Sequence, residues 1–382
     1  MKLQYAILIS CALSLQIASA ANQSSKSKPS ECISYYTTNF AEPIEFPGAR
    51  VQYMTASWHA MASFADEHYR NVLNEVYIWT QPDVTFDSRS ADRVLISEEA
   101  TADDLNEIIA RLNKEINREK GLILDNAERL EADPKHEIDP DGSYRKELRA
   151  RAAAIPLYQP IPSLQAFGLR DENYLTFFVL HHGHIINTRR VLMGTPTETV
   201  KAFIAHFKPR AAGEIPVGQG ACLPNFLVHA PALITQSFRL KDRPEILVEF
   251  EAANASGEEP SNAERVIRSA LQSTYLKPFN RIKYFSSIKV DNRKGEGFFY
   301  RVLPDRGLRQ VTTKDADLKD MGYVAHIPGN NKASSGQSFD LTFKINYYSQ
   351  LAKKPMSESD FKKLAQSIAE SFRMRPNAWV AR

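Results

Sequence analysis

The sequence is poor in cysteine, in surplus charge and in long apolar runs. It has three cysteines, and its formal net charge is only +3. This low charge, without a basic block, argues against nucleic acid as a partner. After residue 20, no stretch approaches the roughly 18 consecutive apolar residues that a membrane-spanning helix needs. We therefore expect no nucleic-acid binding and no stable membrane insertion.

Recognisable catalytic patterns are also missing. The chain has no Gly-x-Ser-x-Gly, no Gly-x-Gly-x-x-Gly and no phosphate-loop pattern. Ser-x-x-Lys, the pattern of periplasmic acyl-enzymes, begins at Ser25, Ser286 and Ser359, but the partner motif Lys-Thr-Gly is absent. Repeated occurrence shows how easily this pattern arises in a chain with many Ser and Lys. The sequence predicts no enzyme and no cofactor, with a hydrolase acting through Ser286 as a rival.

The first twenty residues have the composition of a secretory signal peptide. Lys2 gives a positive start, Tyr5 to Ile17 is almost wholly apolar, and Ala18-Ser19-Ala20 fits the small-x-small cleavage rule. A lipoprotein box ending at Cys11 competes with this interpretation, but too few residues precede it. We expect cleavage after Ala20 and a periplasmic mature chain.

Removal of the leader takes Cys11 and leaves Cys32 and Cys222. In an oxidising compartment these two residues are the candidates for one disulfide. Two separately buried thiols are the alternative, because free Cys is itself commonly buried.

The pattern along the chain predicts an α+β fold with two domains, each a mostly antiparallel sheet with flanking helices. A segment rich in Gly and Pro at 211–220 places the boundary, so we expect a signal peptide over 1–20, an N-terminal domain over 21–213 and a C-terminal domain over 214–382. Helices are expected over 59–74, 102–119 with an extension towards 130, 144–154, 195–207, 261–271 and 357–372. Strands are expected over 76–86, 174–186 as a hairpin turning at 182–183, 245–251, 280–290, 297–303, 309–313, 322–326 and 338–347.

Two groups of residues imitate metal sites. His181, His182 and His184 are possible ligands, but strand geometry points the first two to opposite faces and a turn at Gly183 would splay the third away. The acidic loop with Asp139 and Asp141 resembles the start of a calcium loop. Pro140 interrupts that loop, and Leu148 stands where the twelfth position requires a bidentate Glu. We expect no metal at either place.

Several segments carry a family resemblance. Ile215-Pro216 followed by Gly220-Ala221-Cys222-Leu223-Pro224-Asn225-Phe226-Leu227 resembles the signature at the start of the C-terminal domain in immunity proteins of type VI secretion lipase effectors. Further segments resemble the same family, namely Phe207-Lys208-Pro209-Arg210, Ala263-Glu264-Arg265, a turn at Gly295-Glu296-Gly297, and Ser367-Ile368 with Ser371 to Pro376. Together they span most of residues 190 to 382. In the N-terminal half the family's Cys is followed by Gly-Arg, whereas Ile33-Ser34-Tyr35 follows Cys32 here.

The resemblance implies a periplasmic protein, monomeric before it binds, that grips a cognate secreted phospholipase and blocks its active site or lid opening. Interface hot spots favour Tyr, Trp and Arg. Candidate contacts are the aromatics Tyr35, Tyr36 and Trp58 and the acidic-loop residues Asp139, Asp141 and Tyr144. A periplasmic small-molecule or envelope-binding protein is the alternative function.

Overall fold

The computed structural model describes residues 31–40, 42–46, 48–54, 57–63, 70–72, 74–78, 92–132, 138–254, 284–301, 320–329 and 339–378. The expected signal peptide, the expected helix over 261–271 and the expected strand over 309–313 lie outside these residues.

Most strands join one large antiparallel sheet. Its order is β18-β19-β20-β21-β17-β16-β7-β8-β12-β11-β10-β9, and β3 pairs additionally with β16, which gives 13 strands among the described residues. The bounds are β3 Ile44–Glu45, β7 Asn74–Ile78, β8 Asp92–Glu99, β9 Gln159–Pro160, β10 Ala166–Asp171, β11 Tyr174–His181, β12 His184–Val191, β16 Ala232–Leu240, β17 Ile246–Asn254, β18 Tyr284–Val290, β19 Arg293–Arg301, β20 Met321–Ile327 and β21 Phe339–Tyr347. Sheet and flanking helices confirm the α+β fold class, while the domain division at 213–214 stays a prediction.

Three small sheets complete the strands. Their orders are β1-β2-β22, β13-β15-β14 and β4-β5-β6. The bounds are β1 Glu31–Ile33, β2 Tyr36–Thr38, β4 Gly48–Met54, β5 Ser57–Ser63, β6 Arg70–Val72, β13 Phe207–Pro209, β14 Ala221–Cys222, β15 Phe226–Val228 and β22 Arg373–Met374. The first of these sheets joins the start of the described chain to its end.

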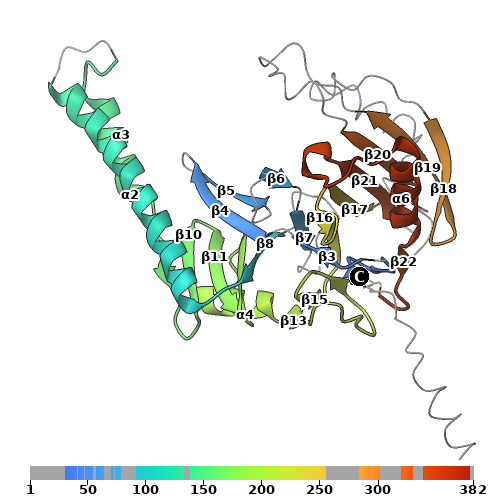
Figure 1. Cartoon of the computed structure of the whole chain (residues 1–382). Coiled ribbons are helices and arrows are strands. Elements are labelled where there is room, and N and C mark those ends of the chain that lie inside the picture. Colours follow the sequence, from blue (N-terminus) through green and yellow to red (C-terminus); the bar gives the residue numbers. More distant parts are fainter. Residues whose placement is uncertain are drawn as a thin grey trace, which may run out of the picture.

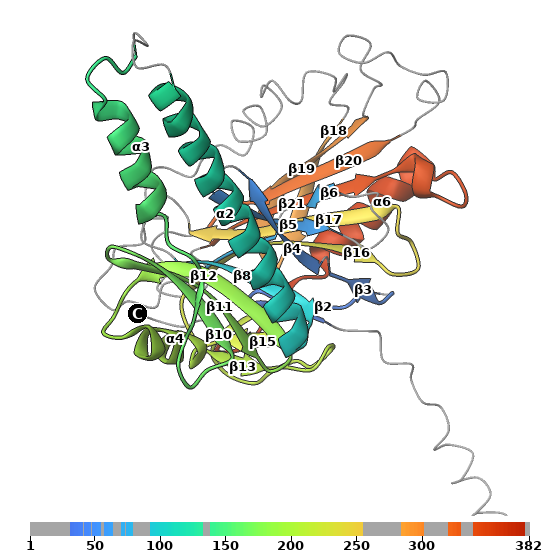
Figure 2. The ribbon, with the colours of Figure 1, turned by 90° about the vertical axis from the view of Figure 1, so that its left-hand side faces the viewer.

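The longest helix, α2 (Ala102–Ala132), pairs with α3 (Ser143–Ala154) to form an arm that projects from the rest of the chain (Figure 1). Figure 2 shows α2 crossing the sheet face formed by β8 and β10 to β12. Its apolar stripe, which includes Leu105, Ile109 and Leu112, packs there against Phe178 and Ile185. The stripe was predicted from its helical spacing, and the predicted extension past 119 is confirmed.

Local cap motifs fix where the helices begin. Asp104 N–H donates to Thr101 Oγ1 (3.3 Å) and Thr101 N–H donates to the Asp104 carboxylate (2.7 Å) before α2. Thr195 and Glu198 form the corresponding reciprocal pair before α4 (Pro196–Ile204). Ser357 caps α6 (Glu358–Glu370), which covers one face of β18, β20 and β21; one turn of 3₁₀ helix, Ser349–Leu351, precedes it. These caps were all predicted from the sequence.

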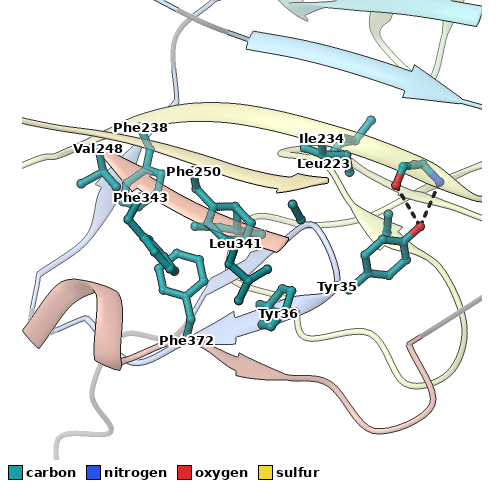
Figure 3. Close-up of a cluster of buried hydrophobic side chains, with 14 of the residues drawn as sticks. Tyr35, Tyr36, Leu223, Ile234, Phe238, Val248, Phe250, Leu341, Phe343 and Phe372 are labelled. Atoms are coloured by element: carbon teal, nitrogen blue, oxygen red, sulfur yellow. Dashed lines mark hydrogen bonds between the residues drawn. The ribbon is translucent and has the colours of Figure 1, made fainter. Parts of the chain in front are cut away.

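The main core lies between the large sheet, the β1-β2-β22 sheet and α6 (Figure 3). Phe250, Phe343 and Phe372 pack with ring centroids 4.7 to 5.1 Å apart. Tyr36 meets Phe250 edge-on at 5.7 Å. Residues from near both ends of the described chain therefore share one apolar cluster.

Three local predictions are wrong. The expected helix over 59–74 is replaced by strands β5, β6 and the start of β7, because β5 pairs with β4 from Gly48↔Ser63 to Met54↔Ser57. The expected turn at Gly295-Glu296-Gly297 lies inside β19, and the turn falls at Asp291-Asn292, whose φ angles are 49° and 64°. Phe207 was assigned to the helix that begins at Thr195, but it lies in β13 and still contacts Phe203.

Gly297, which was assigned to that turn, and Gly322 in β20 both make room for tyrosine rings. The Tyr323 ring lies where a Cβ on Gly297 would stand, and its hydroxyl is 3.3 Å from Ser286 Oγ on β18. On the other sheet face Tyr300 covers Gly322 in the same way. Its hydroxyl donates to Asn346 Oδ1 at 2.9 Å, on the strand beyond. Each tyrosine thus bridges across a neighbouring strand.

Candidate partner-binding site

A disulfide joins Cys32 in β1 to Cys222 in β14, across a sequence separation of 190 residues. Beside it, Ser34 N–H donates to Cys222 O (2.9 Å) and Cys222 N–H donates to Ser34 O (2.6 Å). The pairing of the two mature cysteines confirms the expected disulfide. The bond ties the first described strand to the segment in which the family signature lies.

Arg210 fills the space beside this disulfide, with a side chain that is 1% exposed. Its guanidinium donates to the Glu31 carboxylate at 2.8 Å and to the carbonyls of Leu223 (3.0 Å), Pro224 (3.1 Å) and Glu214 (2.7 Å). A buried guanidinium needs a hydrogen-bond acceptor for each of its donors, because removing the charge from water without such partners is costly in free energy. Arg210 therefore holds β1, the residues after β14 and the segment 211–220 together.

A second buried arginine, Arg375, lies after β22. Its Nη1 donates to Pro216 O (2.7 Å) and Gly218 O (3.2 Å), and its Nη2 donates to Gly220 O. Burial, with a smaller contribution from Arg210, lowers the pKa of Arg375 to about 10. Carbonyl oxygens of the segment 211–220 thus solvate this cation.

We call residues 211–220 the arginine-held loop. Its ends are tied as well, because Gly213 N–H donates to Glu31 Oε2 (3.0 Å) and Gly220 N–H donates to Ala378 O (2.8 Å). Gly213, Gly218 and Gly220 all have positive φ, at 74°, 99° and 132°. Such angles favour glycine, which explains its frequency here.

The β11–β12 hairpin lies against the same region through its histidines. His181 stacks on Phe226 of β15 at 5.9 Å, and His184 meets the same ring edge-on at 5.5 Å. His181 and His184 face each other across the hairpin, so the expectation that the turn splays His184 away is wrong. Burial lowers the pKa of His181. These rings act as packing residues that join the hairpin to β15.

Two of the aromatic residues predicted as exposed anchors are in the core. Tyr35 and Tyr36 are both 0% exposed, and Ala232 N–H donates to Tyr35 Oη at 2.9 Å (Figure 3). Burial raises the pKa of both phenols. Burial in the core, the alternative for these aromatics, therefore holds for both, because β1 and β2 place the run Ile33 to Tyr36 against the core. Trp58 lies in β5, and its side chain is outside the described residues.

The acidic-loop candidates lie at the far end of the helical arm (Figure 1). Asp139 is buried, and its carboxylate accepts from Tyr144 N–H (2.9 Å) and Arg145 N–H (3.3 Å) in the first turn of α3, where a negative charge is favoured. Asp141 is exposed and accepts from Ser143 N–H (3.0 Å), and hydrogen bonding from the Ser143 hydroxyl, with a smaller contribution from this N–H, lowers the pKa of Asp141. Tyr144 is exposed. Asp139 was therefore not the exposed carboxylate expected, while Asp141 and Tyr144 remain candidate contacts.

The serine of the rival hydrolase lacks its lysine. Ser286 and Lys289 are three residues apart on β18, so their side chains point to opposite faces of the sheet. Ser286 Oγ instead lies 3.4 Å from Gly297 O and 3.3 Å from Tyr323 Oη. Ser359 is an exposed residue in the first turn of α6. Ser286 therefore does not have Lys289 as the neighbouring base that nucleophilic catalysis requires.

Sequence reasoning missed the residues that organise this region, chiefly Arg210, Arg375 and Glu31. Arg210 and Arg375 both stand in segments that carried the family resemblance, which is the one signal that singled them out. In the part of the chain that the structure describes, no three His, Cys, Asp or Glu side chains are grouped to hold a metal ion. No helix within those residues is long and apolar enough to cross a bilayer.

Comparisons with known proteins found relatives only among solved structures. No protein-family model matches the chain, and no curated protein matches it. The immunity protein TplEi of the type VI secretion system (T6SS) from Pseudomonas aeruginosa, complexed with "L" peptide, is 14% identical with a TM-score of 0.47, over 92% of this chain and 99% of that one. Its apo structure is 14% identical with a TM-score of 0.45, over 91% and 97%.

The Tle4–Tli4 complex is 12% identical with a TM-score of 0.46, over 91% of this chain and 98% of that one. The TplEi structures are of immunity proteins of the type VI secretion system, the class that the sequence motifs resemble.

Proposed function

We propose that this chain is a periplasmic immunity protein that binds and neutralises a cognate T6SS phospholipase by stoichiometric contact, without catalysis of its own. The binding blocks the lipase active site or the opening of its lid. Residues 1–20 direct export, and the Cys32–Cys222 bond suits the oxidising compartment in which such a lipase acts.

The observation that carries the proposal is the convergence of the segments that bear the family resemblance. Arg373–Pro376 lies far along the sequence from Ile215–Leu227, yet Arg375 donates to Gly220 O across 155 residues. Phe207–Arg210 is close to Ile215–Leu227 in the sequence, and Arg210 donates to Leu223 O. A chance match in unrelated segments has no reason to place matching residues in mutual contact. The convergence therefore supports a shared architecture behind the motifs.

The test is phospholipid hydrolysis by the lipase encoded beside this gene, with and without one equivalent of residues 21–382. Complete loss of activity at a one-to-one ratio is the expected result. Ser286→Ala is the matched control against the hydrolase rival, because it removes the candidate nucleophile and should leave inhibition unchanged. Unaltered lipase activity at tenfold excess would contradict the proposal.

A further inference from the structure

Five of the nine histidines of the chain lie where the β11–β12 hairpin meets strands β13 and β15. They stand at the hairpin tip, directly before β13 and directly after β15, namely His181, His182, His184, His206 and His229. The hairpin reaches β13 through His181, whose Nε2 lies 3.3 Å from Phe207 O. We call this contact, with its five histidines, the histidine joint.

The histidine joint lies between the base of the helical arm and the disulfide. On one side Ala100 N–H, just before α2, donates to Gly183 O in the hairpin turn at 2.7 Å. On the other side β15 pairs with β14, which carries Cys222 of the disulfide. A change in the joint therefore acts on how firmly the base of α2 is held.

His206 and His229 face each other at the end of the β13–β15 pairing. This pairing starts at Phe207↔Val228, and beyond it His229 N–H donates to His206 O at 2.9 Å. His206 Nδ1 lies 3.0 Å from His229 O, and a carbonyl oxygen can only accept. The one proton of the neutral His206 ring is therefore on Nδ1. The same argument places the proton of neutral His181 on Nε2, so both contacts are complete without a second proton.

A second proton on His229 would have no acceptor. Its Nε2 is buried and has no hydrogen-bond partner among the residues that the structure describes. The charged and titratable groups that act on the ring are Lys208 on β13, Arg375 after β22, and His206. Burial is the largest cause, and with these cationic neighbours it lowers the pKa of His229 below the ordinary value of 6.5. Protonation of the closed joint thus costs free energy that protonation of an open joint does not.

The carboxylates around the joint are placed away from His229. Glu99 on β8 pairs with His184, and both Glu99 and its neighbour Glu98 are exposed. Since His184 lies opposite a carboxylate, we assign this ring no part in the response to acid. Glu31 is bonded to Arg210, which follows β13. The remaining titratable groups from elements at the joint are Lys201 in the last turn of α4 and His181 and His182 in the hairpin.

We propose that the histidine joint is an acid-sensitive contact, in which protonation of His229 separates the ends of β13 and β15, releases the hairpin tip from Phe207 O and loosens the base of the helical arm. The device acts within the chain itself, so this inference goes beyond the proposed function and does not depend on it. Below pH 6.5 the open joint binds the proton and the closed joint resists it. Each further pH unit therefore raises the ratio of open to closed joints by up to about tenfold for one histidine.

Hydrogen exchange of the full mature chain, with the disulfide intact, tests the proposal at pH 7.5 and pH 5.5. Exchange rates are divided by the intrinsic rate at each pH, so that the remaining difference reports opening of the structure. The reporters are the backbone N–H groups of His229 and Ala100, whose bonds close the joint on its two sides. Their corrected exchange should rise about tenfold at pH 5.5, and more than that of the core strand β17.

His229→Gln is the deciding variant, because it keeps the backbone carbonyl that accepts from His206 and cannot become charged. The acid-induced rise at both reporters should fall below about twofold in this variant. His182→Gln is the matched control at an exposed position of the hairpin turn, and it should retain the tenfold rise. In the unaltered chain, titration by NMR supplies a second measurement, in which the Ala100 amide and the His229 ring should change with the same midpoint.

Three results would overturn the proposal. The first is corrected exchange at the reporters that is equal at the two pH values. The second is an acid-induced rise that His229→Gln retains, or an Ala100 amide whose NMR midpoint differs from that of the His229 ring. The third is a rise of the same size in β17, because acid would then open the fold as a whole and not the histidine joint.

Discussion

Arg210 and Glu31, which lie 179 residues apart in the sequence, form a buried ion pair beside the Cys32–Cys222 disulfide, with Nη1 2.8 Å from Oε1. The remaining donors of Arg210 go to backbone carbonyls, so the pair belongs to a saturated network. The disulfide fixes the ends of this network covalently, and the arginine fixes the backbone between them. The two act together on the base of the arginine-held loop.

Replacement of Arg210 by Met should lower the free energy of unfolding by about 3–5 kcal/mol, because Glu31 and several carbonyls lose their partner. Urea unfolding measures the effect. Arg189→Met is the matched control, since Arg189 pairs with Asp171 on the surface at 3.2 Å with both side chains more than half exposed. That change should cost less than about 1 kcal/mol. Equal costs for the two variants would contradict the assigned role of Arg210.

Replacement of Cys32 and Cys222 by Ser together should lower the free energy of unfolding by about 3–5 kcal/mol, because the bond closes a long loop in the unfolded chain. Urea unfolding with and without reductant measures this, and reductant should not affect the double variant. Non-reducing mass spectrometry of tryptic peptides from the exported protein should find the two cysteines linked. Detection of two free thiols would contradict the Cys32–Cys222 disulfide.

The helix starts were predictable because their signals are local. The pair Thr195 and Glu198 is complete within four residues, and Ser357 with Asp360 is similarly short. Strand identity depends on partners far along the chain, which is why the segment 59–74 was mistaken for a helix. Its strand β5 pairs with β4, and no local feature of the sequence expresses that pairing. The Gly295–Gly297 turn failed for a related reason, since these glycines make room for Tyr323 and for the backbone of β20.

Of the candidate site, the sequence predicted only the Cys32–Cys222 disulfide. The expected removal of residues 1–20 leaves two cysteines as the candidates for one bond, whereas a buried arginine such as Arg375 has the same sequence signal as a solvated one. The sequence left open whether Tyr35 and Tyr36 are surface contacts or core residues, because their burial is decided by β22 and α6, more than 300 residues away.

Lowering the pH should reduce the free energy of unfolding through protonation of His326. This side chain is 3% exposed, and burial, the largest cause, lowers its pKa. Below pH 6.5, the ordinary pKa of histidine, the unfolded chain binds a proton at His326 more readily than the folded chain does. The contribution of neutral His326 to the free energy of unfolding is therefore present in full above pH 6.5 and is lost as the pH falls below it. The expected slope is at most about 1.4 kcal/mol per pH unit for this group.

Urea midpoints between pH 7.5 and pH 5 measure the effect of His326. His326→Gln should flatten the profile, whereas His182→Gln, a change at an exposed turn residue, should leave it as in the wild type. A profile that His326→Gln does not alter would assign the acid sensitivity to other groups, such as His181 and His229, whose pKa values burial also lowers.

Gly322 and Tyr300 should show strong energetic coupling. A Cβ on Gly322 would stand 1.9 Å from Tyr300 Cζ, and the ring is held in place by the bond from its hydroxyl to Asn346. Gly322→Ala must therefore displace a buried ring and break that bond, at a cost of about 1–3 kcal/mol. Gly121→Ala is the control, because nothing lies within 4 Å of the added methyl group in the interior of α2. It should stabilise by about 0.5–1 kcal/mol.

A double-mutant cycle with Tyr300→Ala tests the physical cause. Once the ring is absent, the methyl group of Gly322→Ala meets no obstacle, so its cost should disappear and the coupling energy should reach about 1–3 kcal/mol. Urea unfolding of the four proteins measures it. Strict additivity would mean that the cost of Gly322→Ala arises in the backbone of β20 and not at the ring. In that case the bridge from Tyr300 to Asn346 would not be the reason that this strand requires glycine at position 322.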